Sequence, residues 1–283
     1  MRELGGRTAI VTGASRGIGP YICRALAAEG MNIVLAARSL SGLDQVSAAL
    51  QSAGAQTLVV STDVADAHNR KTLVEQAVAR FGAVDVLVNN AGIETAGEYA
   101  TTGPAEIEQL LAVNLTAAMQ LAREVLPGML QRRRGHIVNI ASLAGKAPVP
   151  YNVPYAASKA GLLGFSRSLH AELRGTGVGV SAISPGFVSD AGMFHDSSQL
   201  ATVKASRMLG TSTPGHVAAA VVRAIRTNKV DTIVNHSRPM RPFFVLDAAA
   251  PGLVIRLLPL FGANRIMREM ANARRARDEK KSR

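Results

Sequence analysis

The sequence predicts an α/β fold of the doubly wound Rossmann type, with a parallel sheet of about seven strands and a C-terminal helical extension. Short, continuously apolar segments alternate with longer Ala- and Leu-rich segments of helix length. Strands that alternate with helices predict a parallel sheet covered on both faces, and strands that are apolar throughout suit that burial. A glycine-rich turn directly after the first strand is the third observation.

The strand candidates are short runs of mainly apolar and β-branched residues. In chain order they cover residues 7–12, 32–36, 57–61, 84–89, 136–141, 178–184 and 231–234. No linker rich in Pro, Gly or Ser divides the chain before about residue 236, and no internal repeat is evident. We therefore expect one Rossmann-type domain over residues 1–236. Residues 237–283 are expected to form an extension that is not an independent domain.

The composition is that of a globular protein, because 47% of the 283 residues are hydrophobic and 18% are charged. The single cysteine, Cys23, cannot form an internal disulfide, and no basic and then apolar leader precedes the first strand. A reducing cytoplasm is therefore the expected compartment. Cys23 itself is expected to be a small buried residue on a helix.

The formal net charge of +12 admits nucleic acid, an anionic membrane surface or anionic ligands as partners. Much of the excess is local, because residues 265–283 hold eight Lys or Arg against three acids. Four Tyr, seven Phe and no Trp leave few aromatic platforms for a nucleic acid, so we expect no such partner. Peripheral contact of the basic tail with an anionic membrane stays open, as does a solvated, frayed terminus.

The best candidate for a membrane span is the apolar stretch 243–263. It contains Asp247 and Arg256 together with Pro251 and Pro259, whereas a spanning helix wants about 20 apolar residues without such interruptions. We therefore expect no transmembrane helix. The stretch must instead pack on the body of the protein, on a partner subunit or on a membrane surface, and we expect it to be a lid that shapes the substrate entrance.

A glycine-rich turn, Thr12–Gly19, joins the first strand to an Ala-rich helix. Gly13 allows the tight turn, Gly17 lets a pyrophosphate approach the backbone, and Gly19 permits close packing of helix on strand. The helix N-terminus supplies free N–H groups for phosphates, and Pro20 falls in the first turn, where a missing N–H does no harm. Taken alone, the same spacing also fits an ordinary strand-to-helix turn.

The end of the second predicted strand indicates which nicotinamide cofactor is used. An acid there holds the free ribose hydroxyl of NAD, whereas a cation suits the 2′-phosphate of NADP. This chain has Ala36, Ala37 and Arg38 at that place, and Arg16 in the glycine turn can reach the same phosphate. Two guanidiniums without a carboxylate favour NADP(H). The alternative is that Arg38 is a solvated surface residue.

A tyrosine and a lysine four residues apart, Tyr155 and Lys159, lie in a run compatible with a helix. Residues at this spacing share one helix face, so the two side chains are expected to stand side by side. An adjacent ammonium favours the phenolate and lowers the tyrosine pKa from its usual value near 10. The spacing is common by chance, and a half-exposed surface pair would be the simpler interpretation if nothing else agreed.

Other motifs do agree, and together they resemble the short-chain dehydrogenase/reductase (SDR) family over about residues 5 to 235. Their order and spacing match as a set, which makes the resemblance specific. The motifs are the Thr12–Gly19 turn, Asp63-Val64, Asn89-Asn90-Ala91-Gly92, Asn114, Ser142, Tyr155 with Lys159, and Pro185-Gly186.

The resemblance implies four catalytic residues. Tyr155 would exchange a proton with the substrate oxygen, and Lys159 would lower the tyrosine pKa and bond the nicotinamide ribose. Ser142 would hold the substrate oxygen, and Asn114 would support a water path to Lys159. Asn89 is expected to brace the sheet rather than touch a ligand. The helices around Asn114 and Tyr155 would form the interface of a homodimer or homotetramer.

The same resemblance implies a set of cofactor contacts. Asp63 and Val64 look like contacts to the adenine, and the turn from Asn90 to Gly92 would pass beside its ribose. The full set is Gly13, Ser15, Arg16, Gly17, Ile18, Gly19, Arg38, Asp63, Val64, Asn90, Ala91, Gly92, Tyr155, Lys159, Pro185, Gly186 and Val188. No metal site is expected, because the six histidines are scattered and have no cysteine partner.

One departure from the family pattern follows Pro185-Gly186, where Asp190 stands at a position that is Thr in many relatives. An acid beside a pyrophosphate is unfavourable, so the local loop is expected to differ. The substrate mouth is expected to be lined by the loop 186–213 and by residues after His236. Its apolar members point to an apolar alcohol or ketone, namely Phe187, Met193, Phe194, Met208 and Leu209.

The leading hypothesis is an NADP(H)-dependent oxidoreductase that interconverts an alcohol and a ketone or aldehyde by Tyr-Lys-Ser-Asn acid/base catalysis. Two alternatives belong to other classes: a non-catalytic NADP-binding protein and a membrane-surface protein that retains the fold. Neither the substrate nor the direction of reaction follows from the sequence, because one fold and one cofactor site serve many chemistries.

Overall fold

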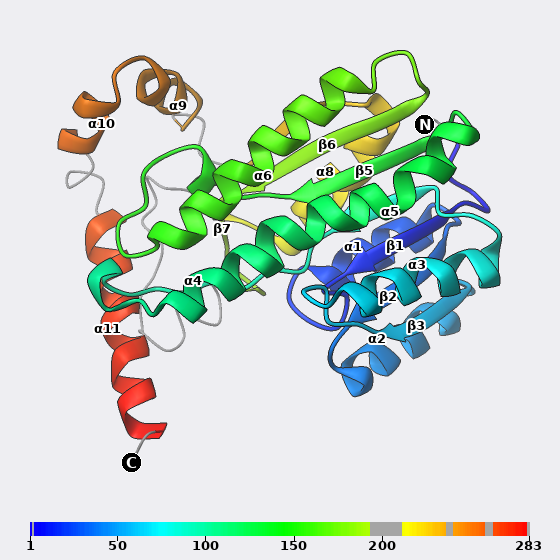
Figure 1. Cartoon of the computed structure of the whole chain (residues 1–283), viewed down its shortest axis with the longest axis horizontal. Coiled ribbons are helices and arrows are strands. Elements are labelled where there is room, and N and C mark those ends of the chain that lie inside the picture. The colour runs from blue at the N-terminus through cyan, green and yellow to red at the C-terminus, as the bar shows by residue number, and fades with distance from the viewer. Residues whose placement is uncertain (2, 193–210, 236–239, 258–262, 282–283) are drawn as a thin grey trace.

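A seven-stranded parallel sheet forms the centre of the computed structural model, which describes residues 1, 3–192, 211–235, 240–257 and 263–281 (Figure 1). The strand order is β3-β2-β1-β4-β5-β6-β9. The strands are β1 (Thr8–Thr12), β2 (Asn32–Ala37), β3 (Thr57–Ser61), β4 (Val86–Asn89), β5 (Gly135–Ile140), β6 (Val178–Pro185) and β9 (Asp231–Val234). All seven predicted strands are confirmed, and each boundary lies within two residues of its expected place.

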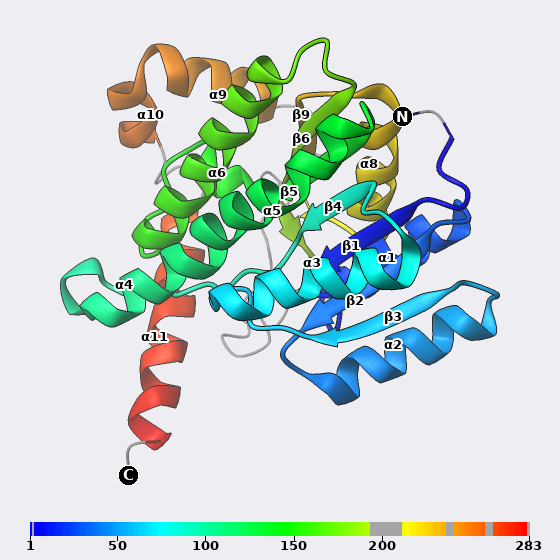
Figure 2. The same cartoon turned by 45° about the vertical axis from the view of Figure 1, so that its right-hand side comes forward.

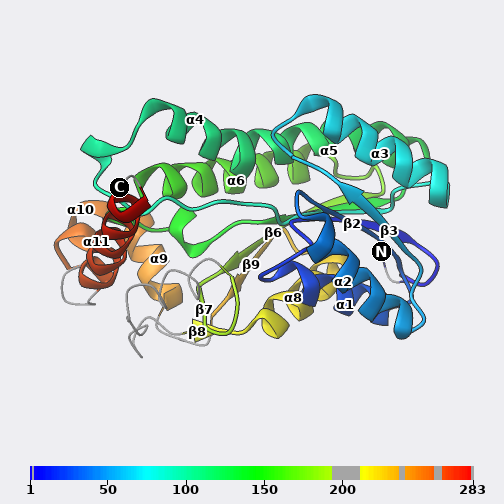
Figure 3. The same ribbon diagram turned by 90° about the horizontal axis from the view of Figure 1, so that it is seen from below.

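Helices cover both faces of the sheet in two layers, which Figure 3 shows edge-on. One layer holds α1 (Gly19–Ala28), α2 (Leu40–Ser52) and α8 (Pro214–Thr227). The other holds α3 (Ala67–Phe81), α5 (Ala117–Gln131) and α6 (Val153–Glu172). Each layer buries its own apolar cluster against the strands. Every residue of β1, β4, β5 and β6 is buried, as expected for strands covered on both sides.

The sheet order reverses between β1 and β4, because β2 lies on one side of β1 and β4 on the other. In open α/β sheets a crevice forms at the carboxyl ends of the strands at such a reversal, and ligands bind there. The predicted glycine turn follows β1, and the predicted Asn89-to-Gly92 motif begins at the end of β4. The topology therefore brings these two motifs to the same crevice.

Five short elements were not predicted. A second, two-stranded sheet pairs β7 (Phe187–Val188) with β8 (Thr211–Ser212), and a π-helical segment (Ala112–Thr116) separates α4 (Pro104–Leu111) from α5. Two 3₁₀ turns also appear, η1 (Tyr99–Thr101) and η3 (Leu143–Gly145). The π-helical segment has five residues and the others two or three, so each is too short for hydrophobic periodicity to reveal it.

The C-terminal extension forms α9 (Met240–Ala249), α10 (Pro251–Leu257) and α11 (Ala263–Lys281). Figure 2 shows α11 descending past α4, and α9 and α10 pack on each other. None of the described helices is both long and apolar enough to cross a bilayer. The expectation of a buried thiol on a helix is confirmed, because Cys23 is 0% exposed on α1 and burial raises its pKa to about 12.

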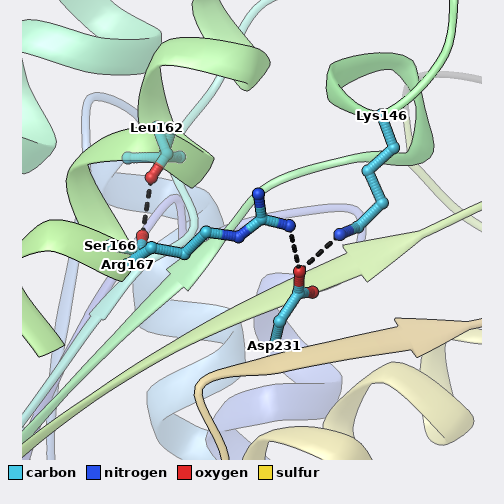
Figure 4. Close-up of polar contacts among 5 residues, drawn as sticks. All are labelled: Lys146, Leu162, Ser166, Arg167 and Asp231. Carbon is cyan, nitrogen blue, oxygen red and sulfur yellow. Dashed lines mark hydrogen bonds and ion pairs between the residues drawn. The ribbon is translucent and has the colours of Figure 1, made fainter. Parts of the chain in front are cut away.

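A cluster of charges fixes the edge strand β9 to the loop after β5 and to α6 (Figure 4). Asp231 opens β9, and its Oδ2 accepts hydrogen bonds from Lys146 Nζ and, at 2.8 Å, from Arg167 Nη2. Burial by itself would raise the pKa of Asp231, but the bonds and charges of the two cations outweigh it and hold that pKa below its usual value. Lys146 lies only four residues after Ser142, so the cluster also anchors a loop of the predicted site.

We predict that Asp231→Asn lowers the free energy of unfolding at pH 7 by about 1.5–3 kcal/mol, because it removes charge-assisted hydrogen bonds. A carboxyl whose folded pKa is depressed stabilises the fold above its unfolded pKa. That stabilisation is lost as the pH falls through the folded pKa. Urea unfolding should therefore show a difference in the free energy of unfolding between the wild type and Asp231→Asn that becomes smaller as the pH is lowered below about 4.

Glu75→Gln is the matched control, because Glu75 pairs with Lys71 on α3 and both side chains are more than 60% exposed. Exposed pairs contribute little, so this variant should stay within about 0.5 kcal/mol of the wild type. Two outcomes would contradict the stabilising role of the Asp231 carboxylate. One is an equal loss of stability in the two variants, and the other is a loss in Asp231→Asn that does not change with pH.

Candidate active site

The glycine turn has the close backbone contacts that a dinucleotide cradle requires. Gly13 has a φ of +65°, and a Cβ on it would lie 2.9 Å from the Ala91 Cα. A Cβ on Gly19 would lie 2.1 Å from the Gly13 carbonyl oxygen, so a side chain there would push α1 away from β1. Gly17 has a φ of +64°, which favours glycine. These contacts leave the N-terminus of α1 open to a phosphate without side chains in the way.

The turn after β4 is fixed to the glycine turn by hydrogen bonds. Asn90 Nδ2 donates to the carbonyl oxygens of Thr12 and Gly13 at 2.9 and 3.1 Å. The backbone N–H groups of Asn90 and Ala91 both donate to Thr12 Oγ1 at 3.0 Å. Asn90 therefore joins the two loops of the crevice through its side chain, which positions the Asn90-to-Gly92 turn beside the expected cofactor path.

The expected role of Asn89 is confirmed, because its side chain lies within the sheet. Asn89 Nδ2 donates to Asn139 Oδ1 at 2.8 Å, and Asn139 Nδ2 donates to Ser166 Oγ at 2.9 Å. These residues are at most 5% exposed. The polar chain crosses from β4 through β5 to α6 and so fixes the helix that carries Tyr155.

The residues expected to choose the cofactor lie in the glycine turn and in the segment between β2 and α2. Arg16 and Arg38 are both exposed. A Cβ on Gly42, in the first turn of α2, would lie 3.0 Å from the Ser15 Cβ, so the glycine turn and the start of α2 face each other. The first turn of α2 carries no acid. Both guanidiniums are exposed on segments next to this approach, and their expected contact with a 2′-phosphate stays a prediction.

The expected adenine contacts follow β3, at the neighbouring end of the sheet. Val64 is 6% exposed. Asp63 Oδ1 accepts the Ala65 N–H at 2.9 Å, which shapes the turn. In the sheet, β3 lies next to β2, which lies next to β1. The residues that follow β3 are therefore at the right place for the adenine end of a dinucleotide whose phosphates lie at the glycine turn after β1.

The predicted acid/base residues come together at the carboxyl end of β5. Tyr155 and Lys159 lie on α6 and are 8% and 3% exposed. Ser142 follows β5, caps η3 by accepting the Ala144 N–H at 3.1 Å, and hydrogen-bonds Tyr155, which lowers the tyrosine pKa. A Cβ on Gly145 would lie 2.6 Å from the Lys159 carbonyl carbon, so η3 packs directly on the backbone of α6.

The tyrosine pKa differs from the expectation, since it is raised rather than lowered. Burial is the largest cause, the charge of Glu94 adds to it, and the Ser142 hydrogen bond only partly opposes them. Lys159 Nζ donates to the Ile140 carbonyl at 2.9 Å and lies 5.7 Å from the centre of the Tyr155 ring. The ammonium is thus held by the end of β5, and burial lowers its pKa to about 8.

Asn114 lies in the π-helical segment and is 1% exposed. Its side chain accepts the Ile93 N–H at 2.8 Å, donates to the Ile93 carbonyl at 2.9 Å, and donates to Ser158 Oγ at 3.2 Å. These partners fix the loop after β4 and the helix of Tyr155. The hydrogen bonds of Asn114 therefore connect the loop after β4 to α6. Its expected role in a water path to Lys159 stays a prediction.

The loop after β6 was expected to differ from the family pattern, and that stays a prediction. Gly186 N–H donates to the Val234 carbonyl at 3.0 Å, and Val188 is buried in the core at 5% exposure. Ser189 N–H donates to the Ser212 carbonyl at 3.0 Å, which extends the β7–β8 pairing. Asp190 is exposed. Phe187 packs under α11, whereas the other expected mouth residues lie outside the described residues: Met193, Phe194, Met208 and Leu209.

Four polar residues near Tyr155 were not predicted: Glu94, Tyr151, Asn152 and Arg274. Asn152 precedes α6 and donates from Nδ2 to Glu94 Oε1 at 2.7 Å. Arg274 lies on α11 and contacts Glu106, and Tyr151 accepts a hydrogen bond from Arg268 of the same helix. No spacing rule links residues 94, 152 and 274, so the sequence carried no local signal for them. Among the described residues, no group of three His, Cys, Asp or Glu is placed to hold a metal ion.

Comparison with known proteins identifies the family. A family model described as short chain dehydrogenase matches residues 7–201. The ketoacyl reductase HetN of Nostoc sp. (strain PCC 7120) is 46% identical over 237 residues, which are 84% of this chain and 81% of that protein. Dehydrogenase/reductase SDR family member 7B of Bos taurus is 32% identical over 283 residues, covering 96% of this chain and 82% of that protein.

Solved structures agree with these relatives. A variant of the actinorhodin polyketide ketoreductase with NADPH superposes with a TM-score of 0.77 and 33% identity, over 83% of this chain and 98% of that one. A metagenomic short-chain oxidoreductase in complex with NADP gives a TM-score of 0.70 and 35% identity, over 82% and 97%.

The fold and the crevice define a Rossmann-type oxidoreductase. With the family match, the chain belongs to the short-chain dehydrogenase/reductase family, as the motifs indicated. The cofactors of the two solved relatives agree with the expectation of NADP(H).

Proposed function

We propose that this protein is an NADP(H)-dependent reductase of ketones on apolar chains, in which Tyr155 donates the proton to the carbonyl oxygen. The observation that carries the proposal is the convergence of Tyr155, Ser142 and Lys159 at the end of β5, in the crevice that also holds the glycine turn. The turn fits a dinucleotide because Gly13 and Gly19 sit where any side chain would collide with backbone. When bound, the cofactor supplies the hydride.

The roles of the residues follow from their protonation. A tyrosine with a raised pKa is fully protonated at neutral pH, so Tyr155 is a proton donor in the reductive direction. Ser142 is placed to donate a hydrogen bond to the carbonyl oxygen that Tyr155 protonates. Lys159 is a cation in the crevice, placed to bind the nicotinamide ribose. Asn114 and the backbone of Ile93 hold the loop between these groups.

The substrate class is supported by the relatives and by the apolar rim. Several curated relatives are named ketoacyl reductases, and one solved relative is a polyketide ketoreductase. Phe187, Met267, Met270 and Val149 form an apolar cluster between α11 and the loops before α6 and after β6. We therefore propose a 3-oxoacyl chain as the substrate class. A homodimer or homotetramer through the helices around Asn114 and Tyr155, and a cytoplasmic location, remain proposals from the resemblance and the single thiol.

We predict that Tyr155→Phe lowers kcat for ketone reduction by about 10²- to 10⁴-fold, the range that a general acid contributes. NADPH affinity, measured by fluorescence titration, should stay unchanged because only a hydroxyl is removed. The control is Tyr99→Phe, since Tyr99 is 58% exposed and lies on η1. Turnover like that of the wild type in Tyr155→Phe, followed by NADPH absorbance with 3-oxoacyl thioesters, would overturn the mechanism.

We predict that Arg38→Ala weakens NADPH binding by about 1.5–3 kcal/mol and leaves NADH binding nearly unchanged, because only NADPH carries the 2′-phosphate. Titration calorimetry with both cofactors measures the difference. Arg123→Ala is the control, because Arg123 is exposed on α5, away from the crevice. An equal loss of affinity for NADH and NADPH would mean that Arg38 has a structural role.

We further propose that residues 1–236 carry cofactor binding and catalysis and that the extension adds a peripheral membrane contact. Its described apolar surface lies on α9 and α10, where Val245 is 72% and Ile255 is 55% exposed. The basic tail that follows supplies attraction to anionic lipid.

We predict that the protein sediments with anionic vesicles at low salt and is released as salt rises. Replacing Val245 and Ile255 by Ser should weaken this binding, because apolar burial contributes to it. Leu40→Ser is the control, since Leu40 is 54% exposed on α2. If the wild type does not sediment with anionic vesicles at low salt, the extension is not a membrane contact.

A further inference from the structure

The C-terminal helix α11 packs against the rim of the candidate active site. Met267 and Met270 are 5% and 3% exposed and contact Val149, Tyr151 and Phe187, which belong to the loops before α6 and after β6. Arg268 Nε donates to the Tyr151 hydroxyl at 2.9 Å. Figure 1 shows α11 beside α4 and the loop that leads into α6. The helix is therefore a wall of the site and not a frayed terminus.

Arg274 extends this wall to the loop after β4. Its Nη2 donates to Glu106 Oε1 on α4 at 2.5 Å, and its Nη1 lies 3.5 Å from the Ala96 carbonyl oxygen. The side chain is 29% exposed, so its charge is only partly screened by water. Ala96 stands two residues after Glu94. Burial raises the pKa of the Glu94 carboxyl above its usual value, and the guanidinium charge of Arg274 only partly opposes that rise.

Glu94 connects this loop to the helix of the catalytic tyrosine. Its Oε1 accepts the hydrogen bond from Asn152 Nδ2, and Asn152 is 2% exposed at the N-cap position of α6, three residues before Tyr155. The Gly97 N–H donates to the Tyr151 carbonyl at 2.8 Å, so the two loops are joined at a second point. A shift of Glu94 would therefore move the start of the helix that carries Tyr155.

The charge of Glu94 also acts on Tyr155. Burial raises the pKa of Glu94, whereas the Asn152 hydrogen bond and Arg274 lower it. In its ionised form Glu94 disfavours the phenolate of Tyr155. The other groups near the phenol are Lys159 on the same helix and the Ser142 hydroxyl after β5.

We propose that Glu94 is a positioning residue for Tyr155 and that Arg274, supplied by the C-terminal helix, holds the loop that carries Glu94 and stabilises its carboxylate. Glu94 holds the start of α6 through Asn152 and keeps the phenol of Tyr155 in its proton-donating form. The C-terminal extension then acts on the acid/base residues of the domain only through Glu94, and neither Glu94 nor Arg274 exchanges a proton with substrate. This inference rests on the proposed role of Tyr155 as the proton donor.

The first test is the pH profile of alcohol oxidation, the direction in which Tyr155 must lose its proton. Glu94→Gln removes the charge but keeps an oxygen that accepts the Asn152 bond. The increase of kcat with rising pH should move to lower pH by about one unit, the order expected when one nearby buried charge is removed. Arg265→Gln is the control, because Arg265 is 84% exposed and pairs with Glu269 on α11 itself. Its profile should match that of the wild type.

The second test follows Glu94 directly and needs no turnover. The infrared band of a protonated carboxyl, assigned by its loss in Glu94→Gln, is titrated against pH in the full chain. Its midpoint should move to higher pH in Arg274→Gln and stay at the wild-type value in Arg274→Lys, which retains the positive charge. Circular dichroism shows whether each variant is folded.

The two tests separate failure of this inference from failure of the proposed function. If Tyr155→Phe abolishes turnover but the Glu94→Gln profile superimposes on the wild type, Glu94 does not act on Tyr155. If the infrared midpoint is the same with and without Arg274, the link to the C-terminal helix is wrong. If Tyr155→Phe retains full turnover, the proposed function fails, whereas the infrared result still decides whether Arg274 acts on Glu94.

Discussion

The site depends on a place where two backbone segments touch with no side chain between them. β1 and α1 meet at Gly13 and Gly19, and Gly13 in turn lies against Ala91 in the turn after β4. A single methyl group at either glycine would overlap backbone atoms, which do not give way as the end of a flexible side chain does. This contact makes room for an anion at the start of α1 and sets the position of the turn after β4, from which Asn90 and Glu94 follow.

Burial then determines how the remaining polar groups behave. Tyr155, Lys159, Ser158 and Asn114 are all at most 8% exposed, so each must find a partner within the protein. Ile140, Ile93 and the backbone of α6 supply those partners. In such an environment a charge has a longer reach than in water, which is why one carboxylate in a neighbouring loop affects the tyrosine.

The sheet and the glycine turn could be predicted from the sequence because each depends on the pattern of a few consecutive residues. The apolar runs marked all seven strands, and the glycine spacing marked the crevice. The raised pKa of Tyr155 was not predicted, because it depends first on burial and then on the charge of Glu94, which lies 61 positions away in the sequence. Likewise, the tail was basic in composition, but only the fold shows that Arg268 and Arg274 turn towards Tyr151 and Glu106.

The contact between Arg274 and Glu106 has a consequence for the order in which the molecule is made. These residues are 168 positions apart, and Arg274 belongs to the last helix of the chain. During synthesis, the strands and the glycine turn leave the ribosome well before this helix does. A nascent chain can therefore assemble its sheet while the wall beside Tyr155 is still absent, and that wall forms only after residues 263–281 have been made.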